Sequence, residues 1–387
     1  PGWGPIPEGQ ETVAEILKEQ GYRTALISDV YHMFKPSKNF WRGFDQWTFL
    51  RGQEEDPYRS GPRPSLEAIE RCLPLEMRED RLKLRFTAQS LMNLYDRPRE
   101  DDYFAAQVFR EASYWLEQNR DAENFFLTIE SFDPHEPWVV PEHYRKMYSH
   151  EEHPLIVLSG YDNTAQLSPR IVDSARASYS GLVTFCDRWF GHFMESLRVL
   201  GLLETTLVIV TSDHGHSIGD RNYLGKRGYP SAPEVYKIPL LVRYPGGKHA
   251  GCKSDRFVQH TDIAATILHF AGISGDRRIH GSPIDPLAQA KGKSSRKHVT
   301  VAWGSAVTVI DDRWWFNCRI NGKGGFLHDL SLNDPFSHNC ADDYPAVAQE
   351  LFAKAIADAD GDFPEWLLDL AEGEEDAPGC SSLAARG

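Results

Sequence analysis

The chain alternates between short apolar runs of strand length and longer segments in which apolar residues recur every three to four positions. The short runs are rich in aliphatic and β-branched side chains, which is typical of strands buried on both faces. They are residues 22–28, 125–130, 207–211 and 238–242. The segments with helical spacing are residues 12–21, 104–115, 168–201 and 262–272. This alternation predicts an α/β fold with a mostly parallel central sheet flanked by helices.

The pattern changes after Ser294. Three short runs alternate between apolar and polar residues, and Asn321-Gly322 is a hairpin signal, so we expect a small antiparallel sheet. An amphipathic helix follows at residues 346–359, and then an acidic stretch that we expect to be disordered. The predicted organisation is an α/β domain at 1–290, an α+β subdomain at 291–365 and a disordered tail at 366–387.

Residues 35–99 interrupt the regular pattern with aromatic residues, glycine, proline and arginine. A structureless stretch of this length is unusual inside a compact domain and more often forms a functional flap than a plain connection. Trp41, Trp47 and Tyr58 could line a substrate cleft, or they could only attach the loop to the body of the protein.

Composition narrows the classes of partner. The formal net charge is −14, from 42 basic and 56 acidic residues, which argues against a nucleic-acid partner. No apolar run approaches the length of a transmembrane segment. The six cysteines form no C-x-x-C pair, so they leave the redox compartment open, and the oligomeric state is equally open.

Chemically competent side chains follow three of the predicted strands. If these strands are parallel neighbours, their carboxyl ends meet at one crevice, where open α/β sheets bind ligands. A nearby loop punctuated by glycines adds a lysine. The residues are Asp29 and His32, His135 between Pro134 and Pro137, Asp213 and His214, and Lys226.

Such a group suits a tetrahedral oxyanion. A divalent cation held by a carboxylate and an imidazole, together with an ammonium, would neutralise charge, and a histidine would protonate a leaving oxygen. The set therefore predicts ester hydrolysis at sulfur or phosphorus. The alternative for the central motif is a turn in which Asp213 caps and Gly215 supplies a positive φ. We also expect the two prolines to hold the backbone around His135 extended.

An ordered set of motifs along nearly the whole chain resembles the sulfatase family, within the alkaline-phosphatase-like superfamily. The motifs are Thr12 to Thr24 (T-x-A-E-x-L-K-x-x-G-Y-x-T), Pro134-His135-x-Pro137, Thr211-Ser212-Asp213-His214-Gly215, Gly219-Asp220, Gly225-Lys226, Ile238-Pro239-Leu240-Leu241, Thr261-Asp262-Ile263-Ala264-Ala265-Thr266, Leu327-His328-Asp329-Leu330 and Asn333-Asp334-Pro335.

The resemblance implies roles for single residues. Asp213 and His214 match two calcium ligands, although Mg²⁺ or Mn²⁺ could also occupy such a site. His135 matches the histidine that assists the leaving group, and Lys226 matches the lysine that contacts sulfate. His32 matches the histidine of a G-K-W-H element, but Asp29 or Val30 stands near the position of its lysine, which puts sulfate contact from this segment in doubt.

A larger departure concerns the nucleophile. Family members begin with two acidic metal ligands and a C-x-P-S-R motif, whose cysteine becomes formylglycine. Residues 1–387 contain no such motif, and Cys72-Leu73-Pro74 only mimics its first half. We therefore expect truncation at the N-terminus, a formylglycine in the missing segment, and no activity from the chain as printed.

The resemblance leaves three functions to compare. The first is hydrolysis of a carbohydrate or aryl sulfate ester. The second is a phosphonate monoester or phosphodiester hydrolase, because the stretch from Gly219 to Tyr229 also resembles that relative. The third is a non-catalytic pseudoenzyme. The resemblance points to the periplasm or to secretion, and a cytoplasmic location stays open.

Overall fold

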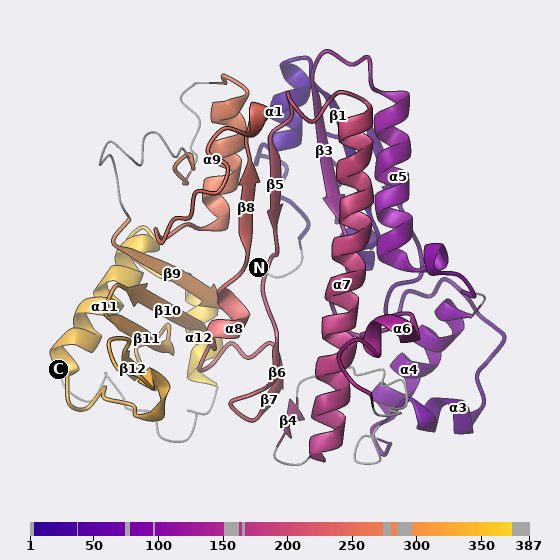
Figure 1. The fold of residues 1–387 in the computed structure, drawn as a ribbon. Helices are drawn as coiled ribbons and strands as arrows, with labels where there is room; N and C mark the ends of the chain where they lie inside the picture. The colour runs from indigo at the N-terminus through magenta and orange to yellow at the C-terminus, as the bar shows by residue number, and fades with distance from the viewer. Residues whose placement is uncertain are drawn as a thin grey trace. The chain divides into compact units, whose positions relative to one another are not determined.

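The computed structural model describes residues 4–36, 38–73, 78–95, 97–150, 162–164, 167–273, 280–284 and 296–373. The chain forms two compact units, each built from separate segments. The first unit comprises Pro1–Leu207, Ile218–Leu224 and Tyr244–Lys248, and the second comprises Val208–Ser217, Gly225–Arg243 and His249–Gly387. Figure 1 shows the course of the chain through both units.

A parallel sheet forms the centre of the first unit. Its strand order is β2 (Gln46–Phe49), β1 (Arg23–Ser28) and β3 (Phe125–Glu130). Ser28 lies opposite Glu130, so β1 and β3 end at the same edge of the sheet. The chain then continues into Asp29 after β1 and into Ser131 after β3. This register brings two of the predicted functional segments together.

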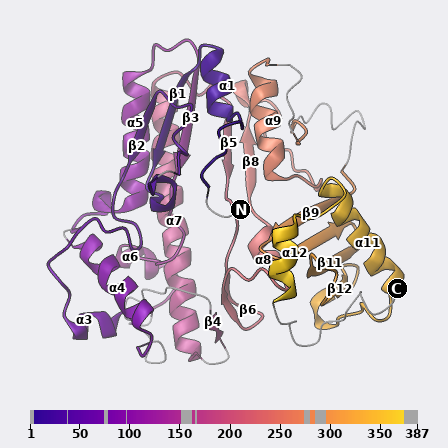
Figure 2. The same ribbon diagram turned by 180° about the vertical axis from the view of Figure 1, so that it is seen from behind.

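Helices α5 (Phe104–Gln118) and α7 (Pro169–Val199) cover one face of this sheet, as Figures 1 and 2 show. Helix α7 begins with Pro169 at its first position, after Ser168, within the predicted range 168–201. The short helix α1 (Val13–Glu19) begins at a capping box between Thr12 and Glu15, within the predicted range 12–21. The buried core of the unit joins side chains of α5 and α7, including Ala105, Ala175, Leu182 and Phe185.

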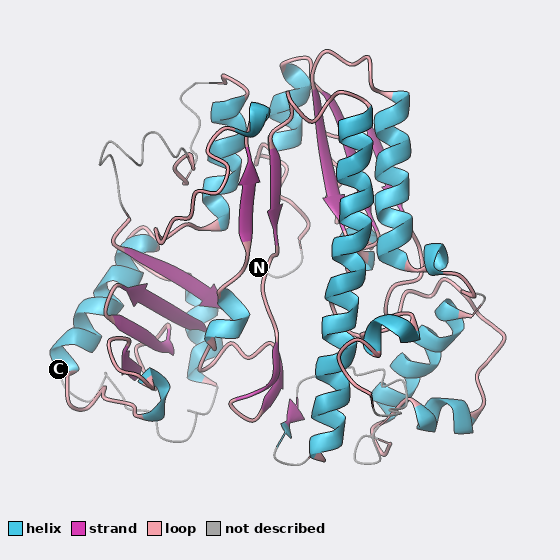
Figure 3. Ribbon diagram, in the orientation of Figure 1, coloured by secondary structure: helices cyan, strands magenta, loops and turns pink. Residues whose placement is uncertain are grey.

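The second unit contains two antiparallel arrangements, coloured as strands in Figure 3. Strands β5 (Val208–Thr211) and β8 (Leu240–Arg243) pair with each other. A four-stranded sheet has the order β12 (Phe326–Asp329), β11 (Trp314–Arg319), β10 (Ala306–Asp311) and β9 (His298–Trp303). Its apolar core packs against α11 (Pro345–Asp358) and α12 (Glu365–Glu372).

Shorter elements complete the described fold. They are α2 (Tyr31–Phe34), α3 (Leu66–Arg71), α4 (Arg81–Leu94), η2 (Glu100–Asp102), α6 (Glu142–Arg145), β4 (Asp162–Asn163), β6 (Ser217–Asp220), β7 (Tyr223–Gly225), α8 (Pro233–Tyr236), η4 (Pro245–Gly247), α9 (His260–Phe270) and η5 (Pro335–Ser337). No helix among the residues described above is both long and apolar enough to cross a bilayer.

The predicted α/β class, with a parallel sheet and a C-terminal antiparallel sheet, is confirmed. The placement of residues 207–211 and 238–242 in the parallel sheet is wrong, because β5 and β8 pair antiparallel with each other. The prediction of an irregular stretch at 35–99 is wrong, because it contains β2, α3 and α4. The side chains that α4 buries are Thr87, Ser90 and Asn93. A helix that buries polar residues has no apolar periodicity to reveal it.

Two further predictions need correction. Residues 366–372, assigned to a disordered tail, belong to α12, because Leu367, Leu368 and Ala371 pack on the C-terminal core. Residues 374–387 lie outside the described part of the chain. The backbone around His135 is a turn instead of an extended segment, since the His135 N–H donates to the Phe132 carbonyl at 2.8 Å. The domain boundary near residue 290 stays a prediction.

Candidate active site

Two buried carboxyl groups lie beneath the shared edge of β1 and β3. Asp29 is fully buried and Asp133 is 7% exposed. The side-chain amide of Gln53 donates to both, at 2.9 Å to Asp29 and 3.1 Å to Asp133. Backbone N–H groups also donate to them, from Phe132 at 2.7 Å and from Ala105 at 3.2 Å. Gln53 thus ties the segment after β2 to the ends of the other two strands.

Burial changes the acidity of this pair. Desolvation, together with the negative charge of Asp133, raises the pKa of Asp29 to about 7. Desolvation also raises the pKa of Asp133 to about 6, while the bond from Gln53 opposes the rise. Burial lowers the pKa of the nearby Arg97 guanidinium, whose centre lies 3.7 Å from the centroid of the Phe104 ring. The pair therefore takes up protons in a range where most carboxyl groups are ionised.

Two predicted catalytic histidines meet one carboxylate above this pair. Nε2 of His32 lies 2.8 Å from Oε2 of Glu54, and Nδ1 of His135 lies 3.9 Å from Oε1 of the same side chain. Nδ1 of His135 also bonds the Glu136 carbonyl at 2.6 Å and lies 3.3 Å from the Glu136 carboxylate. The His135 ring packs on Phe132 with centroids 4.0 Å apart. The first unit thus brings His32 and His135 into one polar cluster.

The bonding partners fix the hydrogen positions on His32. A carboxylate can only accept, so Nε2 of His32 donates to Glu54. An ammonium can only donate, so Nδ1 accepts from Nζ of Lys35 at 3.0 Å. Lys35 follows α2 and reaches back over its own helical turn, where it also lies 4.8 Å from the Tyr31 ring centroid. The order is therefore ammonium, neutral imidazole and carboxylate.

The turn that carries Glu54 is held from several directions. Arg51 donates to both carboxylate oxygens of Asp56, at 2.7 and 2.6 Å. The Glu54 carbonyl accepts from the Ser90 hydroxyl at 3.2 Å and from the Asn93 amide at 3.3 Å. Glu54 itself has a φ of 48°, in the left-handed region. Such a conformation costs about 1–3 kcal/mol and persists only where its surroundings enforce it.

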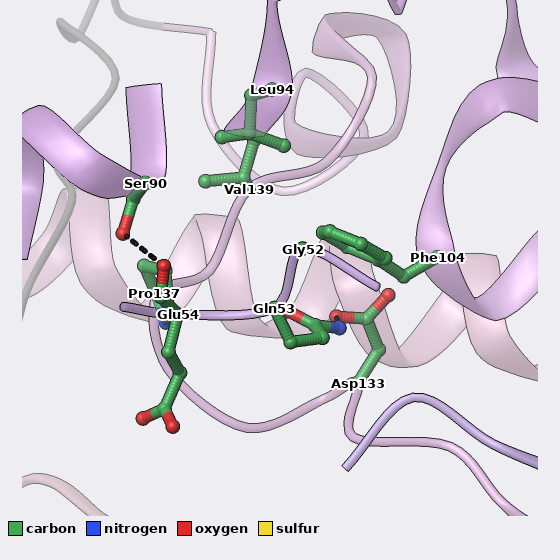
Figure 4. Close-up of a pocket in the computed structure, with 9 residues that line it drawn as sticks. All are labelled: Gly52, Gln53, Glu54, Ser90, Leu94, Phe104, Asp133, Pro137 and Val139. Atoms are coloured by element: carbon green, nitrogen blue, oxygen red, sulfur yellow. Dashed lines mark hydrogen bonds between the residues drawn. The ribbon is translucent and has the colours of Figure 1, made fainter. Parts of the chain in front are cut away.

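A small cavity of about 10 Å³ lies beside this turn, which is room for about one water molecule. Figure 4 shows its lining, in which the Gln53 amide lies beside the Asp133 carboxylate. The Glu54 carboxylate points away from Asp133 in the same view. Neighbouring residues of one turn thus point in different directions, with Gln53 toward the buried acids and Glu54 toward the histidines.

The other predicted ligands lie in the second unit, directly after β5. The Asp213 side chain is 77% exposed, and its Oδ2 lies 3.4 Å from Nε2 of His214. Nδ1 of His214 donates to the Gly215 carbonyl at 3.0 Å. Nε2 of His260 donates to the Ser212 carbonyl at 2.8 Å. The turn is held by these bonds to backbone carbonyls and by the His214 N–H, which donates to Oδ1 of Asp213 at 2.8 Å, and the two side chains remain paired.

Gly215 has a packing role in this turn. Its φ is not in the left-handed range, so the alternative in which Gly215 supplies a positive φ is wrong. Its N–H donates to the Val235 carbonyl at 2.7 Å. A Cβ at this position would lie 2.1 Å from the carbonyl oxygen of Glu234. The close approach of two backbone segments excludes a side chain here.

Lys226 is buried, with 8% of its surface exposed, and it directly follows β7. The loop after it approaches the Asp213 turn through Trp303. A Cβ on Gly228 would lie 2.1 Å from the Trp303 ring, and the same ring lies 5.8 Å from the His214 ring, centroid to centroid. The structure therefore assigns Asp213, His214 and Lys226 to the second unit and His32 and His135 to the first. That all five share one hollow stays a prediction.

The donor chemistry of Asp213 and His214 fits part of a divalent-cation site. A metal-binding histidine usually donates its other ring N–H to a carbonyl, as Nδ1 of His214 does here. Calcium takes about six to eight oxygen ligands. Among the described residues, no three His, Cys, Asp or Glu side chains are grouped so that they could hold an ion. The two residues thus fit as members of a larger ligand set.

Sequence reasoning missed the residues that connect the first unit's cluster. Gln53 and Glu54 lie in the stretch that we expected to be irregular, and no spacing or periodicity marks them. Asp133 directly precedes the Pro134-His135 motif, and α5 donates the Ala105 N–H to its carboxylate. The only sequence signal was indirect, since polar residues accumulate after each strand of a parallel sheet.

Comparison with known proteins identifies related chains. The family model described as Sulfatase matches residues 1–273. A multifunctional alkaline phosphatase superfamily protein, PehA of Trinickia caryophylli, is 27% identical over 75% of this chain and 63% of its own length. An arylsulfatase of Clostridium perfringens is 26% identical over 55% of this chain and 49% of its own length. The chain thus spans about half to two thirds of these relatives.

A solved structure agrees on the fold. The phosphonate monoester hydrolase of Agrobacterium radiobacter superposes with a TM-score of 0.70 at 19% identity, covering 92% of this chain and 81% of that one. An identity this low supports the shared fold alone.

Proposed function

This chain belongs to the sulfatase family, whose model matches residues 1–273, and from that premise we propose that it is a sulfuric ester hydrolase. We propose an aryl or carbohydrate sulfate as the substrate, in line with the name of the arylsulfatase among its relatives. The observation that carries the proposal is the family match, because it includes the segments of His32, His135, Asp213, His214 and Lys226.

The first unit would supply the acid–base chemistry. His135 has two carboxylates near Nδ1, at 3.3 Å from Glu136 and 3.9 Å from Glu54. Their negative charges favour the protonated imidazole. In that form, the opposite ring nitrogen, Nε2, can donate a proton to the leaving oxygen of the ester. His32 resembles the histidine of the G-K-W-H element, and because Nε2 is bonded to Glu54 and Nδ1 to Lys35, its contact with the reacting group would require Lys35 to release Nδ1.

The second unit would supply positive charge. Lys226 would contact the sulfate, and Asp213 and His214 would hold a divalent cation, Ca²⁺ first and Mg²⁺ or Mn²⁺ as alternatives. When bound, such a cation would neutralise the developing negative charge on the ester oxygens. The support for these roles is the motif match together with the Nδ1 bond that orients His214.

The nucleophile is proposed to be a formylglycine supplied outside residues 1–387, since no C-x-P-S-R motif occurs within them. Residues 1–387 alone should therefore turn over no sulfate ester. The test compares this chain with a longer form that carries the gene-encoded sequence upstream, co-expressed with a formylglycine-generating system. Release of sulfate from aryl and carbohydrate sulfates by the longer form alone is the expected result. Absence of release from the whole panel would overturn the proposal.

A second candidate is hydrolysis of phosphonate monoesters or phosphodiesters. It is favoured by the stretch from Gly219 to Tyr229 and by the similarity to PehA, whose name describes a multifunctional enzyme of the superfamily. Rates measured side by side on an aryl sulfate and an aryl phosphonate decide between the two. A larger kcat/KM on the phosphonate would favour this candidate.

The third possibility, a non-catalytic pseudoenzyme, predicts turnover of neither substrate by the longer form. It also predicts that sulfate and phosphonate esters still bind. Isothermal titration with a non-hydrolysed sulfonate analogue separates binding from catalysis.

A further inference from the structure

The Glu54 carboxylate is an acidic group that contacts both predicted catalytic histidines. One oxygen receives the His32 Nε2–H at 2.8 Å and the other lies 3.9 Å from His135 Nδ1. Its side chain is 10% exposed, so water screens these interactions weakly. A single carboxylate therefore acts on two rings that come from different segments, after β1 and after β3.

The backbone of Glu54 is built to keep this orientation. Its φ of 48° is unfavourable for a residue with a side chain, yet Ser90 and Asn93 of α4 bond its carbonyl. On one side Gln53 is bonded to Asp29 and Asp133. A strained conformation held by so many contacts is typical of functional sites.

We propose that Glu54 is a positioning residue for the hydrolysis, which holds His32 in its Nε2–H form and places negative charge beside His135. The catalytic effect of Glu54 rests on the proposed function. The geometric part of the inference, which is the hydrogen position on His32 and the charge beside His135, does not. Glu54 acts through the two rings and does not itself contact the substrate.

Other charged groups also lie near the two rings. Lys35 faces Nδ1 of His32, and Glu136 faces Nδ1 of His135. Glu55, Asp56 and Arg51 act on the neighbouring Tyr31, whose pKa is raised by burial and by the two acids. Glu54 is thus the acid that links the rings. The adjacent Glu55 pairs outward with Arg85 at 3.9 Å, and its side chain is 42% exposed.

The geometric part is tested on the chain of residues 1–387 itself, by ¹⁵N NMR of the histidine rings across a pH series. In the unaltered chain, the neutral His32 ring should carry its hydrogen on Nε2. Glu54→Ala removes the acceptor, so the His32 signals should move toward a mixture of tautomers. Glu54→Gln keeps an acceptor and removes the charge, so His135 should lose its proton at a lower pH than in the unaltered chain.

Glu55→Gln is the matched control, since it removes the same charge one residue away and should leave both rings unchanged. Circular dichroism and the urea midpoint verify that each variant folds. If Glu54→Ala does not fold, the isosteric Glu54→Gln decides alone. Histidine signals in Glu54→Gln that superpose on those of Glu55→Gln at every pH would overturn the proposal.

The catalytic part is tested on the longer, active form. Glu54→Gln should lower kcat about 10- to 100-fold, by analogy with the loss seen when a hydrogen-bonding partner of a metal ligand is removed. The KM should change little, and the basic limb of the pH profile should move to lower pH. Glu54→Asp keeps the charge and should restore part of the rate. NMR changes without a rate effect would overturn the catalytic role, whereas inactivity of every form, the unaltered one included, would contradict the proposed function instead.

Discussion

Asp29 and Asp213 both follow strands of apolar residues, yet their surroundings are opposite. Asp29 is fully buried and accepts two hydrogen bonds, from Gln53 and from the Phe132 N–H. The Asp213 side chain is 77% exposed and faces the imidazole of the next residue. The same residue type at the same kind of position thus serves as a buried link in one unit and as a candidate ligand in the other.

The difference shows what decides the role of a carboxylate at a strand end. Asp29 is covered because Gln53 and Asp133 converge on it from later segments of the chain. Asp213 stays at the surface because the turn after it is fixed through backbone groups, such as the Gly215 N–H. Long-range packing, and not the strand itself, therefore separates a structural acid from one that can bind a ligand.

The largest predicted effect comes from removing the hydrogen bonds that Gln53 donates to the two buried carboxyl groups. Gln53→Leu keeps a similar volume and removes both amide bonds, which leaves two buried carboxyl groups without these donors. Hydrogen bonds to charged groups contribute about 1.5–3 kcal/mol each, so above pH 7, where both carboxyl groups are ionised, the free energy of unfolding should fall by about 3–6 kcal/mol. Urea unfolding followed by circular dichroism measures the loss. Gln118→Leu, on the exposed end of α5, is the control, and an equal loss in both variants would contradict the account.

A smaller effect is expected at the exposed turn, where the backbone is the constraint. Gly215→Ala would place a Cβ 2.1 Å from the Glu234 carbonyl oxygen. Relief of such an overlap requires backbone movement, at about 1–3 kcal/mol. Gly191→Ala in α7 has open space around its Cβ and should be stabilising by about 0.5–1 kcal/mol. Thermal unfolding of the two variants would refute the argument if both moved in the same direction.

Elements with apolar buried faces could be predicted from the sequence, whereas the buried polar contacts could not. Strands β1, β3 and β5 and helices α5, α7 and α11 follow from apolar periodicity, because their buried faces are apolar. Asp213-His214 was marked by the run of β-branched residues before it. Helix α4 was missed because it buries Thr87, Ser90 and Asn93, and Glu54 was missed because those residues position it. Polar residues buried against other polar residues have no periodic signature in the chain.

The smallest predicted effect per pH unit is the change in the free energy of unfolding that results from proton binding by Asp29 and Asp133. The pKa of Asp29 is about 7 and that of Asp133 about 6 in the folded chain, mainly because burial disfavours the ionised forms. Unfolding restores an ordinary value near 4. Between about pH 4 and 7 the folded state therefore binds more protons, so this contribution to stability is complete below about pH 4 and is lost as the pH rises to about 7.

Each proton contributes a slope of at most about 1.4 kcal/mol per pH unit in that window. Asp29→Asn cannot ionise there, so its unfolding free energy should fall less steeply between pH 5 and 7 than that of the unaltered chain. The slope is the measured quantity, because the asparagine also changes the bonds to Gln53 and Phe132. Asp329 in the second unit provides the opposite case, since bonds from Arg313 and Ser331 lower its pKa to about 2. Its stabilisation is lost only as the pH falls toward 2, so Asp329→Asn should leave the slope between pH 5 and 7 unchanged. If the unfolding free energy falls equally steeply with pH in Asp29→Asn and in the unaltered chain, Asp29 carries no proton at pH 5.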